Sequence, residues 1–230
     1  MTRATAVIAA AGSGERLGAG GLKAFVEVSG RPLLAWSLVA FDAAASIERI
    51  VVASPPGAED RAGQVADAAG VEVEVVPGGE HRSQSVANGI VLVESSLVVV
   101  HDAARPLVTA ELVDEVVGRF DHDPDVVGVI AAAPVTDTIK EASVSRRVLR
   151  TPERSRMWAV QTPQAFRTEG LRAAISEHPD ELGAVTDDAM LVERSGGEVL
   201  IHQASPDNIK VTTPRDLRVA ETLLSQRRWP

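Results

Sequence analysis

Residues 4–18 read ATAVIAAAGSGERLG, an apolar run that passes directly into a glycine-rich loop, and this stretch decides the fold. The run Ala4–Ala11 carries no charge, which is typical of a strand buried on both faces of a parallel sheet. Gly12 and Gly14 follow it, and glycines at such a point let backbone amides approach a phosphate. Because open α/β sheets bind ligands at the carboxyl ends of their strands, the loop predicts a ligand site.

Similar apolar runs recur along the chain, and helical patterns separate them. The other predicted strands are Arg49–Ser54, Val71–Val76, Leu97–His101, Val126–Ala133 and Glu198–Gln203. The predicted helices are Leu33–Ala44, Ala58–Ala69, Ser83–Val93 and Glu111–Asp121, with three more beginning near Thr168, after Thr186 and after Thr213. This alternation predicts right-handed βαβ units and an α/β fold with a doubly wound, mostly parallel, Rossmann-like sheet.

The segment 136–163 interrupts the alternation, because it is rich in charge and has no long helical period. We interpret it as a β-arm that protrudes from a single domain spanning residues 1–230. Such an arm exposes strand edges unless another chain covers them. The arm therefore predicts a homodimer contact, with a solvent-exposed flap as the alternative.

The composition excludes several classes of function. The net charge of −9 argues against a nucleic-acid binder, which needs a basic face. The absence of cysteine excludes disulfides, a thiol nucleophile and a thiolate metal site. No apolar run is long enough to span a membrane, and the apolar start suits a buried strand rather than a signal peptide. We therefore expect a cytoplasmic protein without membrane partners.

The glycine loop departs from two common phosphate-binding patterns. The dinucleotide fingerprint needs a third glycine where this chain has Leu17, and an acid at the end of the second strand, which ends at Ala53 and Ser54. The Gly-Lys-Ser/Thr of the kinase and GTPase loop is missing. Arg16 and Lys23 flank the loop instead, and two cations beside backbone amides suit a polyphosphate under attack at phosphorus. The alternative is that Arg16 is a solvated charge and Lys23 caps a turn.

Several motifs together resemble one known family. They are AAGSGERLGAGGLKAF at 10–25, GGEHRSQSV at 78–86, VHDAARP at 100–106, PVTDTIK at 134–140, TPERSRMWAVQTPQAF at 151–166, TDDA at 186–189 and NIKVTTPRDL at 208–217. Nearly the whole chain is similar to the 2-C-methyl-D-erythritol 4-phosphate cytidylyltransferases of the sugar-nucleotidyltransferase superfamily. One departure is Leu22-Lys23-Ala24, where that family usually has Pro-Lys-Gln.

The resemblance implies an enzyme that transfers CMP from CTP to 2-C-methyl-D-erythritol 4-phosphate. The products would be 4-diphosphocytidyl-2-C-methyl-D-erythritol and pyrophosphate, in the non-mevalonate (MEP) pathway of isoprenoid biosynthesis. It also implies a Mg²⁺ that bridges the triphosphate. Ribitol-5-phosphate cytidylyltransferase is the nearest alternative, and a nicotinamide oxidoreductase or a non-catalytic nucleotide-binding module are alternatives of other classes.

The same resemblance supplies the roles of individual residues. Arg16 and Lys23 act on the α-phosphate, while Lys210 and Arg154 place the acceptor phosphate, Arg154 in the site of a partner subunit. The nucleotide-binding residues are Ala10, Ala11, Gly12, Gly14, Gly79, Ser85, Asp102 and Ala103, with Glu80, Arg82 and Ser83 as further candidates. The hydroxyls of Thr138, Thr162 and Thr186 serve the acceptor.

Five residues of these motifs have structural interpretations. Asp102 could contact the ribose or the metal, or could instead cap a helix or form an ion pair with Arg105. Ser83 suits the cap of the following helix. The residue pair Asp187 and Asp188 suits the positive end of a helix. His101, which ends a buried strand, is expected to be structural.

Overall fold

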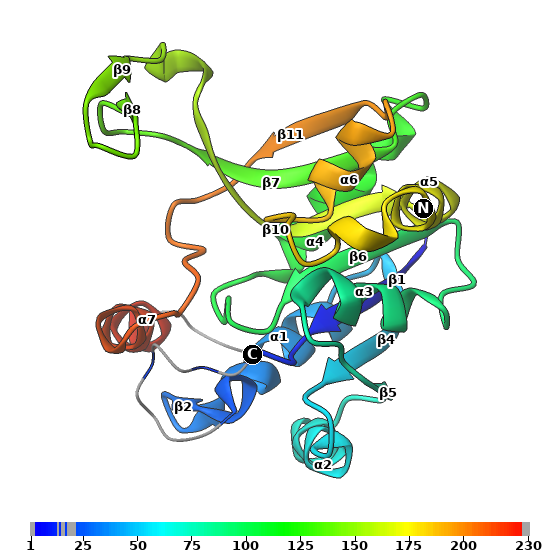
Figure 1. Cartoon of the computed structure of the whole chain (residues 1–230). Coiled ribbons are helices and arrows are strands. Elements are labelled where there is room, and N and C mark those ends of the chain that lie inside the picture. Colours follow the sequence, from blue (N-terminus) through cyan, green and yellow to red (C-terminus); the bar gives the residue numbers. More distant parts are fainter. Residues whose placement is uncertain (1–2, 13, 15–16, 18–21, 227–230) are drawn as a thin grey trace.

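The computed structural model describes residues 3–12, 14, 17 and 22–226. Its centre is a seven-stranded sheet with the strand order β11-β7-β10-β6-β1-β4-β5 (Figure 1). The strands are β1 (Ala4–Ala9), β4 (Ile47–Ser54), β5 (Glu74–Pro77), β6 (Leu97–Asp102), β7 (Gly128–Pro134), β10 (Trp158–Arg167) and β11 (Val199–Gln203). None of the described helices has the length and apolar character needed to cross a membrane.

Most neighbours in this sheet run parallel. The first strand, β1, lies between β4 and β6 and is parallel to both, and β5 continues the sheet beyond β4. At the other side β11 is parallel to β7. Only β10 runs against its neighbours β6 and β7. The predicted α/β class with a doubly wound, mostly parallel sheet is confirmed.

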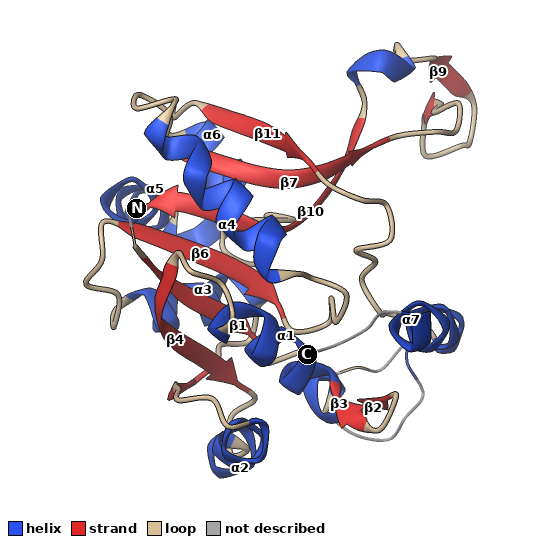
Figure 2. Ribbon diagram, turned by 180° about the vertical axis from the view of Figure 1, so that it is seen from behind, coloured by secondary structure: helices blue, strands red, loops and turns tan. Residues whose placement is uncertain are grey.

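Helices cover both faces of the sheet (Figures 1 and 2). One face carries α1 (Leu33–Asp42), α2 (Glu59–Ala69) and α4 (Ala110–Gly118), and the other carries α3 (Arg82–Ile90), α5 (Thr168–Glu177) and α6 (Ala189–Arg194). Successive side chains of β1 enter the two layers in turn, since Ile8 packs in the core with α1 and Val7 packs in the core with α3. This alternation explains why the parallel strand β1 is apolar on both of its faces apart from Thr5.

A smaller third cluster ties the C-terminal helix α7 (Pro214–Gln226) to a short hairpin of β2 (Glu27–Val28) and β3 (Arg31–Pro32). Val28, Trp36 and Leu224 are among its buried residues, and Trp36 Nε1 donates to the carbonyl of Val28 at 3.0 Å. The hairpin was not predicted, because two-residue strands carry no periodic signal. It follows η2 (Lys23–Phe25), so the cluster supports the segment that carries Lys23.

The arm comprises residues 136–157, and it is the extended tip between the antiparallel strands β7 and β10. It holds β8 (Glu141–Ala142), β9 (Val148–Arg150) and the 3₁₀ turn η4 (Arg154–Arg156), and it projects away from the sheet in Figure 1. Two further 3₁₀ turns are η3 (Arg119–Asp121) and η5 (Pro179–Glu181).

The predicted arm boundary at residue 163 is wrong, because β10 begins at Trp158 and lies in the middle of the sheet. Its sequence did not indicate a central strand for two reasons. The register of its pairing with β7 shifts between Val160 and Gln164, around Pro163, which has no N–H for the ladder. Its buried side chains Gln161 and Thr162 are polar, and they are held by side-chain hydrogen bonds instead of apolar contacts.

The start of α7 is confirmed as predicted, with Thr213 before Pro214. The carboxylate of Asp216 accepts hydrogen bonds from the backbone N–H groups of Thr212 (2.9 Å) and Thr213 (2.8 Å), and Thr213 Oγ1 accepts from the N–H of Asp216 (3.2 Å). Burial alone would raise the pKa of Asp216, but the hydrogen bonds to its carboxylate, first of all that from the Thr212 hydroxyl at 2.7 Å and then those from the two N–H groups, outweigh it and lower the pKa from 3.8 to about 2. The ionised form therefore stabilises the fold.

We expect Asp216→Asn to lower the free energy of unfolding by about 1 kcal/mol at pH 7. Because the pKa in the folded state is depressed, this contribution is complete above the ordinary pKa of 3.8 and is lost as the pH falls through about 2. Urea unfolding of both proteins at pH 7 and near pH 2.5 measures it, with Asp60→Asn, an exposed residue of α2, as the control. A difference that is equal at both pH values would contradict this explanation.

Candidate functional site

A cavity of about 550 Å³ opens at the carboxyl ends of β1, β5 and β6. These strands are parallel members of one sheet, so the loops that follow them meet at the same edge. The cavity brings together ten of the predicted site residues, namely Ala10, Ala11, Gly12, Gly14, Lys23, Gly79, Ser85, Asp102, Ala103 and Lys210. Segments from positions 9 to 212 therefore converge on one place.

One end of the cavity is a tight turn after β5. Ser85 Oγ accepts from the N–H of Gly79 at 3.0 Å and donates to the carbonyl of His81 at 3.1 Å, so its hydroxyl fixes the shape of the turn. Gly78 lies against the loop after β1, since a Cβ there would stand 2.4 Å from the Cβ of Ala11 and 2.9 Å from the carbonyl oxygen of Ser54. Only glycine allows this close approach of the two loops.

The predicted helix cap at Ser83 is wrong. The helix α3 begins at Arg82 after His81, no side-chain cap bond forms at His81, and Ser83 is buried in the first turn. The first turn instead directs Arg82 toward the cavity.

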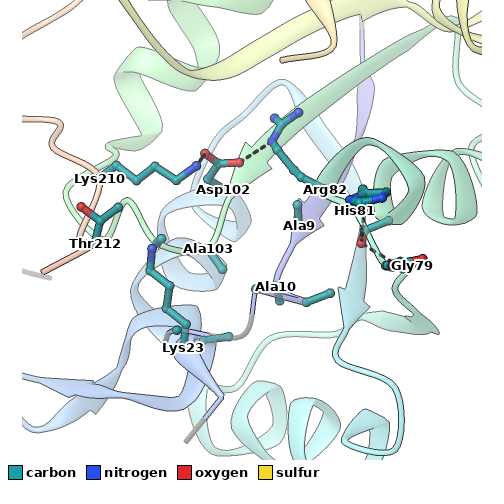
Figure 3. Close-up of a pocket in the computed structure, with 17 residues that line it drawn as sticks. Ala9, Ala10, Lys23, Gly79, His81, Arg82, Asp102, Ala103, Lys210 and Thr212 are labelled. Atoms are coloured by element: carbon teal, nitrogen blue, oxygen red, sulfur yellow. Dashed lines mark hydrogen bonds and ion pairs between the residues drawn. The ribbon is translucent and has the colours of Figure 1, made fainter. Parts of the chain in front are cut away.

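The opposite side of the cavity carries Lys23. Its backbone N–H donates to the carbonyl of Gly12 at 3.3 Å, and a Cβ on Gly14, whose φ is +71°, would lie 3.0 Å from the Cβ of Lys23. Leu22 and Ala24, the departures from the family pattern, pack into the hydrophobic core on either side of it. Figure 3 shows Lys23 and Lys210 on the same side of the pocket, with Ala9 and Ala10 between them and Gly79.

Asp102 stands at the end of β6 between two cations (Figure 3). Its Oδ1 binds Arg82 Nε at 2.7 Å and its Oδ2 binds Lys210 Nζ at 2.6 Å. Burial disfavours the charge of this carboxylate, but Arg82 and Lys210 outweigh that effect and hold the pKa of Asp102 well below its ordinary value. The carboxylate is therefore ionised and serves both cations.

The predicted alternative of an ion pair between Asp102 and Arg105 is wrong. Arg105 Nη1 donates to the carbonyl of Asn208 at 2.8 Å and Nη2 donates to that of Val160 at 3.3 Å. Arg105 thereby fixes the segment that carries Lys210 beside the end of β6.

Arg82 has a second carboxylate partner in Asp188. Arg82 Nη1 forms an ion pair with Oδ2 of Asp188, whose side chain is 0% exposed. Burial favours the neutral form of Arg82, but the carboxylates Asp188 and Asp102 outweigh it and raise the pKa of the guanidinium. Asp188 lies 106 residues from Arg82, and the sequence offered no signal for this pair.

His101 is structural, as predicted, and it supports Asp102 through Thr162. Thr162 Oγ1 accepts from the N–H of Asp102 at 3.0 Å and lies 3.0 Å from His101 Nδ1, while His101 Nε2 lies 3.3 Å from the carbonyl of Arg105. Burial lowers the pKa of His101 to about 3, so the ring is neutral. Its Nε2 then donates to Arg105, and Thr162 donates to Nδ1.

A second cavity of about 410 Å³ adjoins the first along β10 and the start of α6. Thr162 and Thr186 line it, in agreement with a position beside the site, although the Thr162 hydroxyl is already engaged within the protein. Arg82, Asp102 and Lys210 line both cavities. These three charged side chains therefore form the boundary between the two spaces.

Two predicted residues are not brought to either cavity of this chain. Arg154 is exposed on the arm, where its Nη1 donates to the carbonyl of Thr136 at 3.0 Å, and Thr138 is exposed on the same arm. Neither residue lines the two cavities. Arg16 lies outside the described residues.

Comparison with known proteins agrees with this geometry. The family IspD, 2-C-methyl-D-erythritol 4-phosphate cytidylyltransferase, matches residues 4–226. A protein of that name from Prochlorococcus marinus is 40% identical over 223 residues, which are 96% of this chain and 97% of that protein. Another from Rubrobacter xylanophilus is 41% identical over 232 residues, with 99% and 97% covered.

Solved structures are similar over the same length. The 4-diphosphocytidyl-2C-methyl-D-erythritol synthase of Anaerococcus prevotii has a TM-score of 0.85 and 28% identity, with 98% of this chain and 97% of that chain covered. The 2-C-methyl-D-erythritol 4-phosphate cytidylyltransferase of Thermus thermophilus has a TM-score of 0.77 and 32% identity, with 97% and 100% covered.

The close approach of Gly78 to Ala11 allows a direct test of whether the nucleotide binds at this turn of the cavity. A methyl group there must displace Ala11, the Ser54 carbonyl or Ser85, and overpacking of this kind costs about 1–3 kcal/mol. We expect Gly78→Ala to raise the Kd for CTP about tenfold or more, measured by calorimetric titration. The control is Gly118→Ala, because a Cβ at Gly118 meets no atom within 4 Å. Equal affinity in the two variants would show that CTP does not use this turn.

Proposed function

The chain belongs to the 2-C-methyl-D-erythritol 4-phosphate cytidylyltransferase family, and we propose how its cavity performs the reaction. The enzyme is a nucleotidyltransferase that transfers CMP from CTP to 2-C-methyl-D-erythritol 4-phosphate in isoprenoid biosynthesis. The observation that supports the assignment of roles is the position of Lys23 and Lys210 on one side of the cavity, across from the Gly79 turn.

We propose that cytosine occupies the turn formed by Gly79 and Ser85, and that the triphosphate lies along the loop after β1 toward Lys23. Amides of a glycine loop suit phosphate oxygens. The described lining contains three cations, Lys23, Arg82 and Lys210, against the carboxylates of Glu80 and Asp102. The lining alone thus carries one more cation than carboxylates in a chain whose net charge is −9, which suits an anionic ligand better than the rest of the surface.

The transfer needs no protein nucleophile, because the attacking group is a phosphate oxygen of the acceptor. In the proposed step this oxygen forms a bond to the α-phosphorus of CTP. The bond from that phosphorus to the β-phosphate oxygen breaks, and pyrophosphate leaves with the electron pair. The obstacle is repulsion between two anions, and each cation at about 4 Å offsets on the order of 4 kcal/mol at an effective dielectric constant near 20. Lys23 and Arg16 act on CTP, and Lys210 acts where the acceptor phosphate must arrive.

Mg²⁺ is part of this proposal. Proteins usually hold it with one or two carboxylates together with substrate phosphates and water. Both oxygens of Asp102 already bind Arg82 and Lys210, and the described residues contain no group of three His, Asp or Glu that could hold a metal. The residues therefore fit a Mg²⁺ that is held mainly by the triphosphate. Asp102 could become a ligand of this ion only if its contact with the Lys210 ammonium were broken. The bound ion would neutralise phosphate charge.

Pyrophosphate release with Mg²⁺ is the decisive measurement. We expect release with CTP and 2-C-methyl-D-erythritol 4-phosphate, and not with UTP, ATP or GTP. Lys23→Ala should lower kcat by about 100-fold or more, since removing one transition-state contact costs that much in other enzymes. The control is Arg119→Ala, because Arg119 pairs with Asp123 at 2.8 Å beyond the end of α4 and lines neither cavity. Release with ribitol 5-phosphate instead would preserve the chemistry and change the acceptor.

We also propose that the enzyme is a homodimer joined through the arm of a single domain, and that it works in the cytoplasm, where CTP is available. The arm exposes apolar side chains, with Val144 105% exposed, Val148 61% and Leu149 63%. Apolar groups gathered on a two-stranded hairpin favour cover by another chain. Because Arg154 lines neither cavity of its own chain, we infer that it serves the site of the partner.

This arrangement predicts complementation between two inactive variants. Arg154→Ala and Lys23→Ala subunits, mixed after reversible dissociation, should regain about a quarter of wild-type activity, because half of the dimers are mixed and each holds one complete site. Pyrophosphate release and the mass of the mixed species measure the outcome. A dimeric mixture that stays inactive would show that Arg154 serves the site of its own chain.

A further inference from the structure

The buried carboxylate of Asp188 is not explained by the start of α6. Asp187 performs that task, since its Oδ1 accepts from the N–H of Met190 at 3.1 Å, whereas Asp188 makes no side-chain cap bond. Asp188 instead contributes its charge to Arg82. A buried carboxylate is retained at a cost in desolvation, so its position beside a site residue suggests a function there.

The contacts form an alternating series of four charges, Asp188, Arg82, Asp102 and Lys210. Asp188 binds Nη1 of Arg82, and Asp102 binds Nε with only one of its oxygens. The remaining nitrogen, Arg82 Nη2, is buried and has no hydrogen-bond partner among the described residues. Arg82 therefore holds each carboxylate through a single nitrogen, which leaves Oδ2 of Asp102 for Lys210.

A guanidinium prefers to bind a carboxylate through two nitrogens when nothing prevents it. Without the charge of Asp188 at Nη1, Arg82 can turn onto Asp102 and engage both of its oxygens. Lys210 would then lose its partner at 2.6 Å and its fixed place on the boundary of the two cavities.

We propose that Asp188 is a positioning residue for the transfer reaction, which acts through Arg82 and Asp102 to hold the Lys210 ammonium between the two cavities. The inference rests on the proposed function, because it assigns Lys210 to the meeting point of the two phosphates. Asp188 touches neither substrate in this account.

A positioning residue changes the kinetic constants kcat and KM in a different way from a residue that only stabilises the fold. Replacing Asp188 by asparagine removes one negative charge beside an anion site, so CTP binding is preserved or improved. The reaction slows because Lys210, which meets the acceptor phosphate, is misplaced, and small displacements of this kind lower rates by about 100-fold. A loss of kcat without a rise in the KM for CTP therefore identifies the positioning role.

We expect Asp188→Asn to lower kcat by about 10- to 100-fold while the KM for CTP stays within about threefold of the wild type or falls. The control is Asp114→Asn, since Asp114 also accepts three hydrogen bonds, from the N–H groups of Ala45 and Ser46 and from Ser46 Oγ, but lies outside both cavities. We expect the control to unfold at a lower temperature and to keep wild-type kcat at 25 °C.

A double-mutant cycle separates action through Lys210 from any other effect. In a Lys210→Ala background, Asp188→Asn should lower kcat by less than about twofold, because the group that it positions is already gone. Asp188→Glu keeps the negative charge and is the second variant if Asp188→Asn does not fold. Its smaller loss of kcat should likewise vanish in the Lys210→Ala background.

The outcomes are distinct. Wild-type kcat in Asp188→Asn, or an equal loss with and without Lys210, would overturn the positioning role. A rise in the KM for CTP alone would do the same, because it would place Asp188 in ground-state binding of the nucleotide. If the wild-type enzyme releases no pyrophosphate from CTP in the same assay, the proposed function fails before the role of Asp188 is in question.

Discussion

The carboxylate of Asp102 receives Arg82 on one oxygen and Lys210 on the other, and the geometry of the site depends on this shared contact. It lies at the end of β6, a strand that has neighbours on both sides, and at Asp102 itself the backbone pairs with Ala9 of β1. Thr162 and the neutral ring of His101 fix it further. An ionised group held so firmly can order two cations whose long side chains would otherwise sample many rotamers.

The rest of the fold delivers groups to that point. The parallel strands β1 and β5 bring the glycine loop and the Gly79 turn to the edge where β6 ends. The antiparallel strand β10 brings Thr162, and the segment after β11 brings Lys210, with Arg105 bound to the carbonyl of Asn208 nearby. Such a site needs rigid supports, since anions that repel each other must be held close enough to react.

The hairpin of β7 and β10 links this site to the proposed second subunit. Its base lies in the centre of the sheet, and its tip is the exposed apolar arm. The position of Arg154 on that tip, outside both cavities, is the reason for assigning it to the site of a partner. In this arrangement dimerisation would complete the site as well as cover the arm.

The sequence by itself determined the alternation of strands and helices, the glycine loop, Lys23 and Lys210 as candidate residues that the structure places at one cavity, and the family. Local signals carry all of these: hydrophobic periodicity, glycine spacing, and motifs that extend over a few residues. The tertiary structure alone decided that β10 enters the sheet, that Asp102 pairs with Arg82 and not with Arg105, and that Asp188 lies beside Arg82. The last pair is separated by 106 residues, and the order of strands in the sheet sets which distant residues meet. Polar residues such as Gln161 and Thr162 can line a central strand only because tertiary hydrogen bonds satisfy them, and no local pattern of the chain encodes those bonds.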